Sequence, residues 1–449
     1  MIRSKDDSMG KRELIGSYKF DYLLLVSFII LTAFGILTIY SAGAGSSGIR
    51  AIEKQYIKQI YWAITGIVIF ILLLFINYQK FGEYAFVIYA SSILLLIITL
   101  IFGKRIRGAK SWLTIIGGFG FQPSEFIKIA LIISLARFLD RIGEEIKKFK
   151  YVLLALLIIF LPIGLILLQP DFGTALVYIP IGLVMLYFGG MKYTHLISIL
   201  ITFGIAVTLP LMTTFSKLTQ STNLSFLQML DDSKVVLIIA LLFGVLSFIS
   251  FVIFKIVKKD IIFKATNIFL IFFAGLVFSA FLGELMKPYQ TERLVVFLKP
   301  TIDPFGSGYN IIQSKIAVGA GGLFGKGLMG GTQSQLGFLP EKSTDFIFSI
   351  FAEEWGFMGS FFLLAIFGLL IYRGIMIIYL TKDLFGNLVA TGIVGMFLFH
   401  IIINIGMTIG VMPITGIPLP FMSYGGSFLL TCMAGVSVLF NVEMRRNVH

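Results

Sequence analysis

The chain has 449 residues, of which 57% are hydrophobic and only 13% are charged. A soluble domain usually has about 25% charged residues, so the composition excludes an ordinary soluble fold and predicts an all-α polytopic membrane protein. The formal net charge of +13 is interpreted as basic residues that orient membrane spans and meet anionic lipid headgroups, and no nucleic-acid partner is expected.

Twelve apolar runs are long enough to cross a membrane as helices, which takes about 20 residues each. They follow a polar tail at residues 1–20 and lie near 21–40, 56–76, 84–102, 122–138, 151–169, 172–189, 194–212, 235–257, 261–286, 346–372, 385–411 and 415–440. The first run has no small-residue cleavage site, so it is interpreted as a retained span and not as a signal peptide. The runs 194–212 and 235–257 are interpreted as one additional hairpin.

Basic residues mark one side of these spans. An even number of spans places both termini on one side, and that side collects most Lys and Arg residues, among them Arg3, Lys5, Lys147, Lys148, Lys258, Lys259, Arg445 and Arg446. Because positive residues stay in the cytoplasm, both termini are expected there, in a cytoplasmic (inner) membrane. The segments on the outer face are then 41–55, 103–121, 170–171, 213–234, 287–345 and 412–419.

The outer segment 287–345 is the longest connection between spans. It separates a first membrane bundle, 21–286, from C-terminal membrane helices at 346–441 and a cytoplasmic tail at 442–449. This extracytoplasmic loop is too rich in aromatic and aliphatic residues for disorder, so it is expected to be partly folded against the membrane. Tyr309 to Val318 is predicted to form a short interfacial helix. Chemistry on polar substrates is expected in this loop or at helix ends that face it.

The run Gly319 to Gly331 in this loop does not match a phosphate-binding P-loop, because Ala320 and Gly327 stand where that motif needs Gly and Ser or Thr. Residues 325–330 match G-x-G-x-x-G, but no strand is expected before them. The preferred interpretation is a tight turn that lies close to other backbone. Lys326 is an alternative contact for a lipid phosphate.

Several ionisable groups within or beside spans are candidates for a site. Glu125 and Lys128 lie three residues apart on one helix face and can pair; such a pair either serves a substrate pathway or holds the bundle together. Asp171 follows a break between two apolar runs, and is either a loop residue or a carboxylate aimed into a central cavity. Glu353 and Glu354 point to different helix faces, so at most one is expected to serve the site.

Cysteine and histidine contribute little to the expected chemistry. Cys432 is the only cysteine in the sequence, which excludes an intrachain disulfide and a cysteine-cluster metal site. His195, His400 and His449 lie outside the long loop, so neither histidine acid–base catalysis nor zinc chemistry is expected. His400 and Asn404, one helical turn apart, are expected to make polar contacts between helices.

Six motifs resemble the RodA/FtsW (SEDS) family of shape, elongation, division and sporulation proteins. In the family's order they are Gly108-Ala109-Lys110-Ser111-Trp112-Leu113, Phe121-Gln122-Pro123-Ser124-Glu125-Phe126, Gln169-Pro170-Asp171-Phe172-Gly173-Thr174-Ala175, Asp303-Pro304-x-Gly306-x-Gly308-Tyr309, Thr344-Asp345-Phe346-Ile347-Phe348 and Pro418-Leu419-Pro420-Phe421-Met422-Ser423-Tyr424-Gly425-Gly426-Ser427. Residues 331–335 and 351–356 are more similar to the RodA branch than to the FtsW branch. Family members usually have ten spans, so the expected fold is that core plus the additional hairpin.

The resemblance implies a peptidoglycan glycosyltransferase that polymerises lipid II at the outer membrane face during cell elongation. It implies two kinds of partner, a class B penicillin-binding protein that crosslinks the strands and the rest of the elongation machinery. It also implies that Asp303 is the catalytic aspartate, that Trp112 is functionally sensitive, and that Glu125 and Lys128 form a buried pair.

The residues suit this chemistry. A carboxylate within hydrogen-bond reach of the acceptor hydroxyl can act as a general base, for a gain of roughly 10²–10⁴-fold in rate, and Asp303 is assigned that role. Basic groups would neutralise the departing lipid pyrophosphate, with or without a divalent cation such as Mg²⁺ or Mn²⁺, and no organic cofactor is expected. The candidate substrate contacts are Arg105, Arg107, Lys110, Arg293, Trp112, Ser423, Glu125, Lys128 and Asp171.

Two alternatives remain open. A lipid II flippase would also explain broken helices and buried charges, but a transporter needs no base in the long outer loop. A non-catalytic membrane scaffold predicts that the intramembrane charges can be neutralised without loss of cell-wall synthesis.

Overall fold

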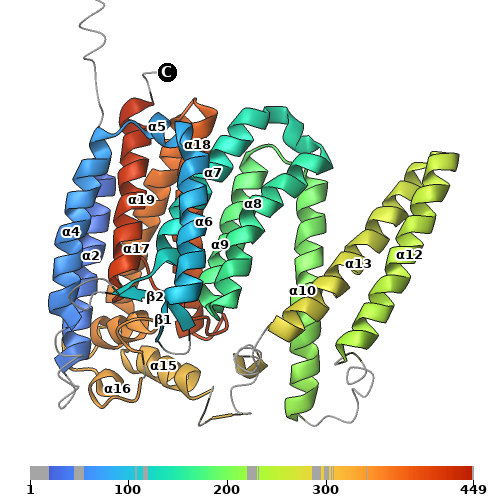
Figure 1. Cartoon of the computed structure of the whole chain (residues 1–449). Helices are drawn as coiled ribbons and strands as arrows, with labels where there is room; N and C mark the ends of the chain where they lie inside the picture. Colours follow the sequence, from blue (N-terminus) through green and yellow to red (C-terminus); the bar gives the residue numbers. More distant parts are fainter. Residues whose placement is uncertain are drawn as a thin grey trace, which may run out of the picture.

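The computed structural model describes residues 20–44, 55–106, 109–114, 120–219, 230, 232–285, 295–297, 303–304, 306, 308–339 and 341–446. Within these ranges the chain is helical apart from one small sheet, and most of its long helices run roughly parallel (Figure 1). The long helices are α2 (Tyr22–Ala44), α4 (Gln55–Phe75), α6 (Ala85–Phe102), α7 (Pro123–Ile142), α8 (Phe149–Leu168), α9 (Phe172–Phe188), α10 (Tyr193–Thr219), α12 (Ser233–Val257), α13 (Asp260–Leu285), α17 (Ile347–Leu380), α18 (Leu384–Thr408) and α19 (Gly426–Arg445).

Each of the twelve predicted spans overlaps one of these helices, but the last one, predicted at 415–440, begins too early, because residues 415–425 precede α19 without forming a helix. In the described part of the chain ten helices are long and apolar enough to cross a membrane, and the two others are α7 and α9. α9 has only 17 residues, and α7 carries the charged residues Glu125, Lys128, Arg137, Asp140 and Arg141. Both pack against α18 inside the bundle. The prediction of an all-α polytopic membrane protein is therefore confirmed.

Local sequence explains where several of these helices begin. Asp171, Asp232 and Asp383 each precede a helix and accept a hydrogen bond from a backbone N–H of its first turn. This capping satisfies a donor that has no partner within the helix, and it favours aspartate at these positions. Pro123 occupies the first position of α7, where its missing N–H has no cost.

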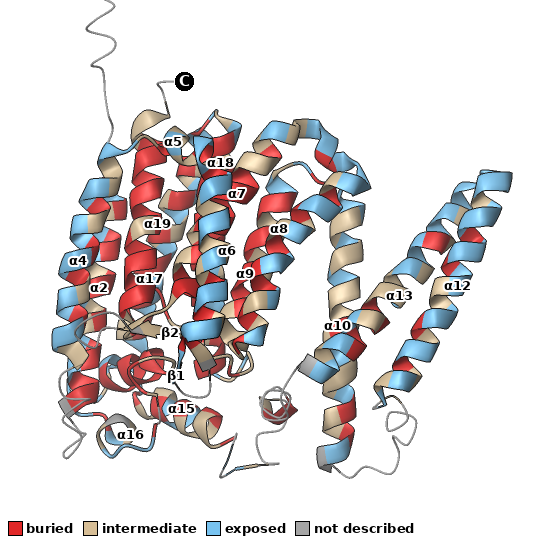
Figure 2. Cartoon of the chain, in the orientation of Figure 1, coloured by how far each residue is buried: buried red, intermediate tan, exposed pale blue. Residues whose placement is uncertain are grey.

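Burial separates a central bundle from a peripheral group of helices (Figure 2). In the most apolar windows of α18 and α19, 78% and 89% of the residues are buried, against 11% in α10 and in α13. α18 packs on α7, α9 and α17, and α19 packs on α4. The exposed apolar side chains of α10, α12 and α13 are those that a membrane would cover with lipid.

The peripheral helices are arranged differently from the predicted hairpin of 194–212 with 235–257. α10 and α12 each make their main contacts with α13 and not with each other. The hairpin consists of α12 and α13, joined by Lys258 and Lys259. The predicted pairing is therefore wrong, because apolar helix surfaces in lipid carry no sequence signal that says which neighbours pack together.

The sheet and two short helices lie at the end of the bundle opposite the C-terminus, which we call the loop end (Figure 1). The antiparallel sheet has the order β1-β2-β3, with β1 at Lys104–Ile106, β2 at Ala109–Thr114 and β3 at Gly120–Phe121. α15 (Tyr309–Ala320) and α16 (Thr332–Gln335) belong to the long loop 287–345. The predicted helix at 309–318 is confirmed. The short elements α5 (Tyr78–Glu83) and the 3-10 helix Gly143–Lys147 lie at the other end.

Candidate active site

Asp303 lies in a tight turn at the loop end, a few residues before α15. Its Oδ1 accepts a hydrogen bond from Gly306 N at 2.9 Å, and its carbonyl oxygen accepts one from Gly308 N at 2.9 Å. A Cβ atom on residue 306 would overlap the carboxylate, so a side chain there would displace it from this position. Asp303 is half-buried. Its carboxylate is therefore ordered by the turn and still accessible.

α15 holds this turn against the bundle. Ser314 is fully buried; its Oγ lies 2.6 Å from Ser349 Oγ of α17 and donates to Thr408 O at the end of α18 at 2.7 Å. The apolar face of α15 packs into a small cluster formed by Ile311, Ala317, Leu339, Phe346 and Ile414. The helix that follows Asp303 is thus fixed to two spans of the bundle.

The break between α8 and α9 faces the same end and carries a half-buried carboxylate. Asp171 Oδ1 accepts from Thr174 N at 3.2 Å, and Oδ2 accepts from Gln122 Nε2, just before α7, at 2.8 Å. Burial raises the pKa of Asp171 above its usual range, and these hydrogen bonds partly offset that effect. Gln169 O accepts from Lys110 N of β2 at 3.1 Å. Asp171 therefore lies where α7, α9 and the sheet meet.

Glu125 and Lys128 form the predicted buried pair in the first turns of α7. Lys128 Nζ lies 2.6 Å from Glu125 Oε2 and 3.2 Å from His400 Nε2 of α18. His400 Nδ1 lies 3.0 Å from Pro418 O. The carbonyl can only accept, so Nδ1 carries the proton and Nε2 accepts from the lysine. The pair links α7, α18 and the segment before α19, which favours a role in holding the bundle together.

The segment 412–425, which precedes α19, is packed inside the loop end. Ser423 is 1% exposed; its Oγ donates to Thr344 O at 2.6 Å and accepts from Leu419 N at 2.8 Å. Asn404 Nδ2 of α18 donates to Asp345 O at 3.0 Å. Ser423 therefore joins this segment to the long loop. Its side chain faces the interior, and its predicted contact with substrate stays a prediction.

The sheet carries the predicted tryptophan. Trp112 of β2 is half-buried and pairs in register with Lys104 of β1. A Cβ atom on Gly120 of β3 would press against the indole ring, so the ring lies next to that strand. This arrangement leaves part of the aromatic surface accessible at the loop end, as a sugar-stacking role requires.

The predicted basic contacts divide into three groups. Lys110 Nζ donates to Ile101 O at the end of α6 at 2.8 Å, so part of its hydrogen-bonding capacity serves the fold. Arg105 of β1 is exposed at the loop end. Arg107 and Arg293 lie outside the described residues.

The glycine-rich run turns against the backbone of α17, as predicted. Lys326 N donates to Glu353 O at 3.0 Å, and Gly327 N donates to Glu354 O at 2.9 Å. Lys326 Nζ also lies 3.0 Å from Glu353 Oε1. Glu354 points elsewhere and accepts from Ser41 Oγ of α2. The tight-turn interpretation is confirmed, and the lysine considered for a lipid phosphate is paired with a carboxylate of the protein.

Sequence reasoning missed the amide side chains that organise this end of the bundle. Gln59 and Gln169 are fully buried. Gln59 Nε2 donates to Ser423 O at 3.2 Å, and Gln169 Nε2 donates to Leu96 O at 3.1 Å. A signal for them existed in the sequence, because a glutamine within or at the end of an apolar span is costly to bury unless it finds partners.

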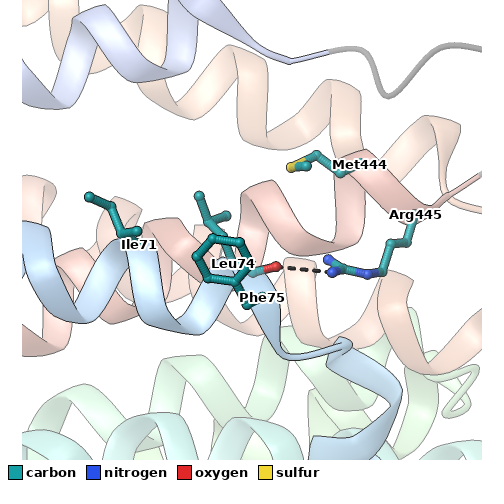
Figure 3. Close-up of a pocket in the computed structure, with 5 residues that line it drawn as sticks. All are labelled: Ile71, Leu74, Phe75, Met444 and Arg445. Atoms are coloured by element: carbon teal, nitrogen blue, oxygen red, sulfur yellow. Dashed lines mark hydrogen bonds between the residues drawn. The ribbon is translucent and has the colours of Figure 1, made fainter.

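A small apolar pocket of about 270 Å³ lies at the other end of the bundle, between the ends of α4 and α19 (Figure 3). Arg445 Nη2 donates to Leu74 O there at 3.0 Å, and Nη1 donates to Asn441 Oδ1 at 2.7 Å. The guanidinium therefore caps the carbonyl end of α4. This pocket is separate from the loop end and does not belong to the candidate site.

The loop end combines an accessible carboxylate on Asp303, an exposed guanidinium on Arg105 and a half-buried indole on Trp112. Such groups can take a proton from a hydroxyl, attract an anionic leaving group and stack on a sugar. Among the described residues, no three His, Cys, Asp or Glu side chains gather in a way that would hold a metal ion.

Comparisons with known proteins agree over nearly the whole chain. Residues 21–234 and 220–448 match the model of the FtsW, RodA and SpoVE family, described as cell cycle proteins. The peptidoglycan glycosyltransferase RodA of Treponema pallidum (strain Nichols) is 40% identical over 442 residues, which cover 96% of this chain and 99% of the relative. The peptidoglycan glycosyltransferase MrdB of Escherichia coli (strain K12) is 33% identical over 442 residues, which cover 98% of each chain.

Two solved structures are similar along their full length. One is a chain of a peptidoglycan synthase complex described as coordinating polymerization and crosslinking, with 28% identity, a TM-score of 0.67, and coverage of 95% of this chain and 98% of that chain. The other is the rod shape determining protein RodA of Thermus thermophilus, with 25% identity, a TM-score of 0.58, and coverage of 95% and 97%.

Proposed function

The chain belongs to the cell cycle protein family of FtsW, RodA and SpoVE, and we propose that it polymerises lipid II into glycan strands with Asp303 as the general base. It is a peptidoglycan glycosyltransferase of cell elongation, like the relatives RodA and MrdB that it matches over nearly their full length. The observation that carries the assignment of the base is the turn at 303–308, which presents an ordered and accessible carboxylate at the loop end.

The proposed reaction needs one proton acceptor. Asp303 takes the proton from the acceptor sugar hydroxyl, whose oxygen attacks the anomeric carbon of the donor. The bond between that carbon and the lipid pyrophosphate breaks, and the pyrophosphate leaves with the bonding electrons. Attack opposite the leaving group inverts the configuration, from an α-linked pyrophosphate to a β-linked glycan. The leaving group is already good, so no general acid is required.

The other candidate residues support this step in different ways. Arg105 is exposed at the loop end and is proposed to attract the pyrophosphate, a role for which Lys110, Arg107 and Arg293 remain candidates. Trp112 is proposed to stack on a sugar ring. The Glu125–Lys128 pair is proposed to hold α7 against α18. A divalent cation bound to the pyrophosphate oxygens stays a candidate for the same neutralising role.

The distribution of charge supports one orientation in the membrane. The end of the bundle opposite the loop end carries Lys147, Lys148, Lys258, Lys259 and Arg445. In our proposal this end, with both termini, faces the cytoplasm and the loop end faces outward from the cytoplasmic membrane. The partner is proposed to be a class B penicillin-binding protein, in line with the similarity to a chain of a peptidoglycan synthase complex.

The test is polymerisation of lipid II by the purified full chain in detergent, with and without the crosslinking partner. Asp303→Asn keeps the oxygen that accepts from Gly306 N but lowers the basicity of the group, so glycan strands should be reduced by roughly 10²–10⁴-fold. Asp232→Asn is the matched control, because Asp232 also caps a turn, by accepting from Lys234 N at 2.9 Å. Normal strands from Asp303→Asn would remove the base assignment.

The same experiment separates the enzyme from a lipid II flippase. Detergent micelles have no leaflets, so a flippase consumes no lipid II there and a polymerase builds chains. A non-catalytic scaffold would also leave lipid II unchanged. Asp303→Asn would then not change the amount of lipid II consumed, either with or without the crosslinking partner.

A further inference from the structure

α17 is not a continuous helix. Gly356, in its third turn, has φ 64° and ψ −161°, so the chain leaves the helical conformation and re-enters it. Such a break removes the helical partners of backbone groups on both sides of it. The groups freed here include the carbonyls of Glu353 and Glu354 and the N–H groups of Phe357 and Met358. Within a membrane protein they need partners other than water.

The glycine-rich turn supplies all four partners. Lys326 N and Gly327 N donate to Glu353 O and Glu354 O, and Phe357 N and Met358 N donate to Gly322 O and Leu323 O, over distances of 2.9 to 3.0 Å. The approach is close enough to exclude side chains, since a Cβ atom on Gly325 would overlap Glu354 O. The run 321–327 is therefore inserted into the break of α17 in the manner of an added strand.

The carboxylate of Glu353 holds the inserted turn against α17. Glu353 is fully buried, and its Oε1 accepts from Lys326 Nζ at 3.0 Å, Thr332 Oγ1 at 3.1 Å and Gln333 N at 3.0 Å. Lys326 Nζ also donates to Thr332 Oγ1 at 2.8 Å. Lys326 belongs to the inserted turn itself, and the other two donors, Thr332 and Gln333, belong to the start of α16. A charged acceptor with several donors makes hydrogen bonds stronger than neutral ones.

The contact between the inserted turn 321–327 and α17 is linked to Asp303 through α15. This helix begins at Tyr309, six residues after Asp303, and ends at Ala320, next to the inserted turn. Its middle is fixed by Ser314, and its C-terminal part is fixed by the packing of Ala317 and by the turn that Glu353 holds. The position of the carboxylate of Asp303 relative to the bundle therefore depends on both anchors.

We propose that Glu353 is a positioning residue for the transfer reaction, which it serves by locking the glycine-rich turn into the break of α17 and so fixing α15 and the Asp303 turn. This inference rests on the proposed function. A displacement of about 1 Å in a reacting group can cost roughly 10²-fold in rate. Loss of the contacts that Glu353 makes with the turn should therefore lower mainly kcat. The lipid II concentration at half-maximal rate should stay nearly unchanged.

The experiment compares Glu353→Gln, Lys326→Met, Lys326→Arg and the double variant Glu353→Gln/Lys326→Met in the lipid II assay. The two single neutralising variants should lower kcat by roughly 10–10²-fold, and the double variant should be no worse than the poorer single one, because both remove the same interaction. Lys326→Arg keeps the ion pair and should restore most of the rate. Hydrogen exchange should speed up over residues 321–333 but stay unchanged in α18 and α19.

Glu443→Gln is the matched control. Glu443 is 6% exposed and pairs with Arg446 at 2.9 Å, but it lies at the other end of the bundle. It should change neither kcat nor exchange at 321–333. If Glu353→Gln does not fold, Lys326→Met tests the inference in its place. The lysine side chain is 29% exposed, so its replacement should disturb folding less. Wild-type kcat in Lys326→Met, or loss of rate without faster exchange at 321–333, overturns the inference. Activity in Asp303→Asn would instead overturn the proposed function.

Discussion

The central bundle and the peripheral group α10, α12 and α13 are built from similar apolar residues but are held together in different ways. In the central bundle, buried charges and amides join helices to each other and to the long loop, as in Lys128 with Glu125 and His400. In the peripheral group the polar contacts between α12 and α13 are made by hydroxyls, such as Thr266 Oγ1 to Ser250 Oγ at 2.9 Å and Ser247 Oγ to Thr266 O at 3.2 Å. Its largest buried cluster is Val236, Ala240, Leu276 and Ala280.

This difference predicts which parts of the chain tolerate substitution. Lipid is as apolar as leucine, so apolar packing alone gives weak preference for one neighbour over another. A buried ionic or amide contact is specific, but it leaves a costly group behind when one partner is removed. Substitutions of buried polar residues should therefore destabilise the central bundle strongly. Substitutions in the peripheral group should have small effects.

The largest effect is expected from Lys128→Met. This change leaves the carboxylate of Glu125 buried without its counter-charge, which costs about 3–5 kcal/mol. The variant should show a strongly lowered melting temperature in detergent or a low yield of folded protein. Glu125→Gln/Lys128→Met should recover part of the loss, because no buried charge remains.

The control for that prediction is Lys148→Met. Lys148 forms an ion pair with Glu145 in the same i, i+3 spacing, but both side chains are exposed. Solvent screens an exposed pair, so its removal should change stability little. Equal melting shifts in Lys128→Met and Lys148→Met would contradict the claim that burial makes the central pair critical.

A smaller but still large effect is expected from Gly325→Ala. Gly325 has φ 81°, and a Cβ atom there would overlap Glu354 O, so both strain and overlap oppose the change. Together they should cost about 2–4 kcal/mol. Gly327→Ala is the comparison, because φ is 85° but nothing lies within 4 Å of the added atom. Its cost should be about 1–2 kcal/mol. Equal thermal stabilities of the two variants would mean that the turn is not inserted as described.

The sequence predicted well the features that depend on local pattern. Apolar runs gave the twelve helices, the spacing of Glu125 and Lys128 gave their pairing, and the glycine run gave a turn close to backbone. In each case the residues involved are near each other in the chain or share one strong periodicity.

The remaining features depend on contacts that no local pattern encodes. The break at Gly356 looks like any glycine in an apolar span, and its partners lie about thirty residues away in the long loop. Glu353 and Glu354 are adjacent, yet they contact Lys326 and Ser41 respectively. α13 packs on both α10 and α12 through mainly apolar surfaces, so the pattern of apolar residues offered no way to choose the pairing.

A moderate and pH-dependent effect is expected from Lys342→Met in the long loop. Lys342 is 7% exposed, and burial lowers its pKa below the usual range. Between the lowered pKa and the ordinary value of about 10.4, the unfolded chain binds more protons than the folded one. The stability contributed by this group therefore rises with pH in that window. Lys342→Met should flatten this rise, which melting temperatures measured across that pH window would show. A steeper rise in the variant would contradict the sign.

The smallest effect is expected from Thr266→Val in α13, which tests the tolerant side of the comparison. Thr266 Oγ1 donates to Ser250 Oγ and also lies 2.9 Å from Ile262 O, so its removal leaves Ser250 with its bond to that same carbonyl at 3.2 Å. Hydrogen bonds between membrane helices contribute about 0.6 kcal/mol on average. The variant should melt close to the wild type and polymerise lipid II at the wild-type rate. Asn404→Leu, in α18, removes two hydrogen bonds to carbonyls of the loop end, at 3.0 and 2.7 Å. It should lower both the melting temperature and the polymerisation rate. If Thr266→Val instead abolished polymerisation, the peripheral group would have to take part in the reaction. The central bundle and the peripheral group would then not differ in their tolerance of substitutions.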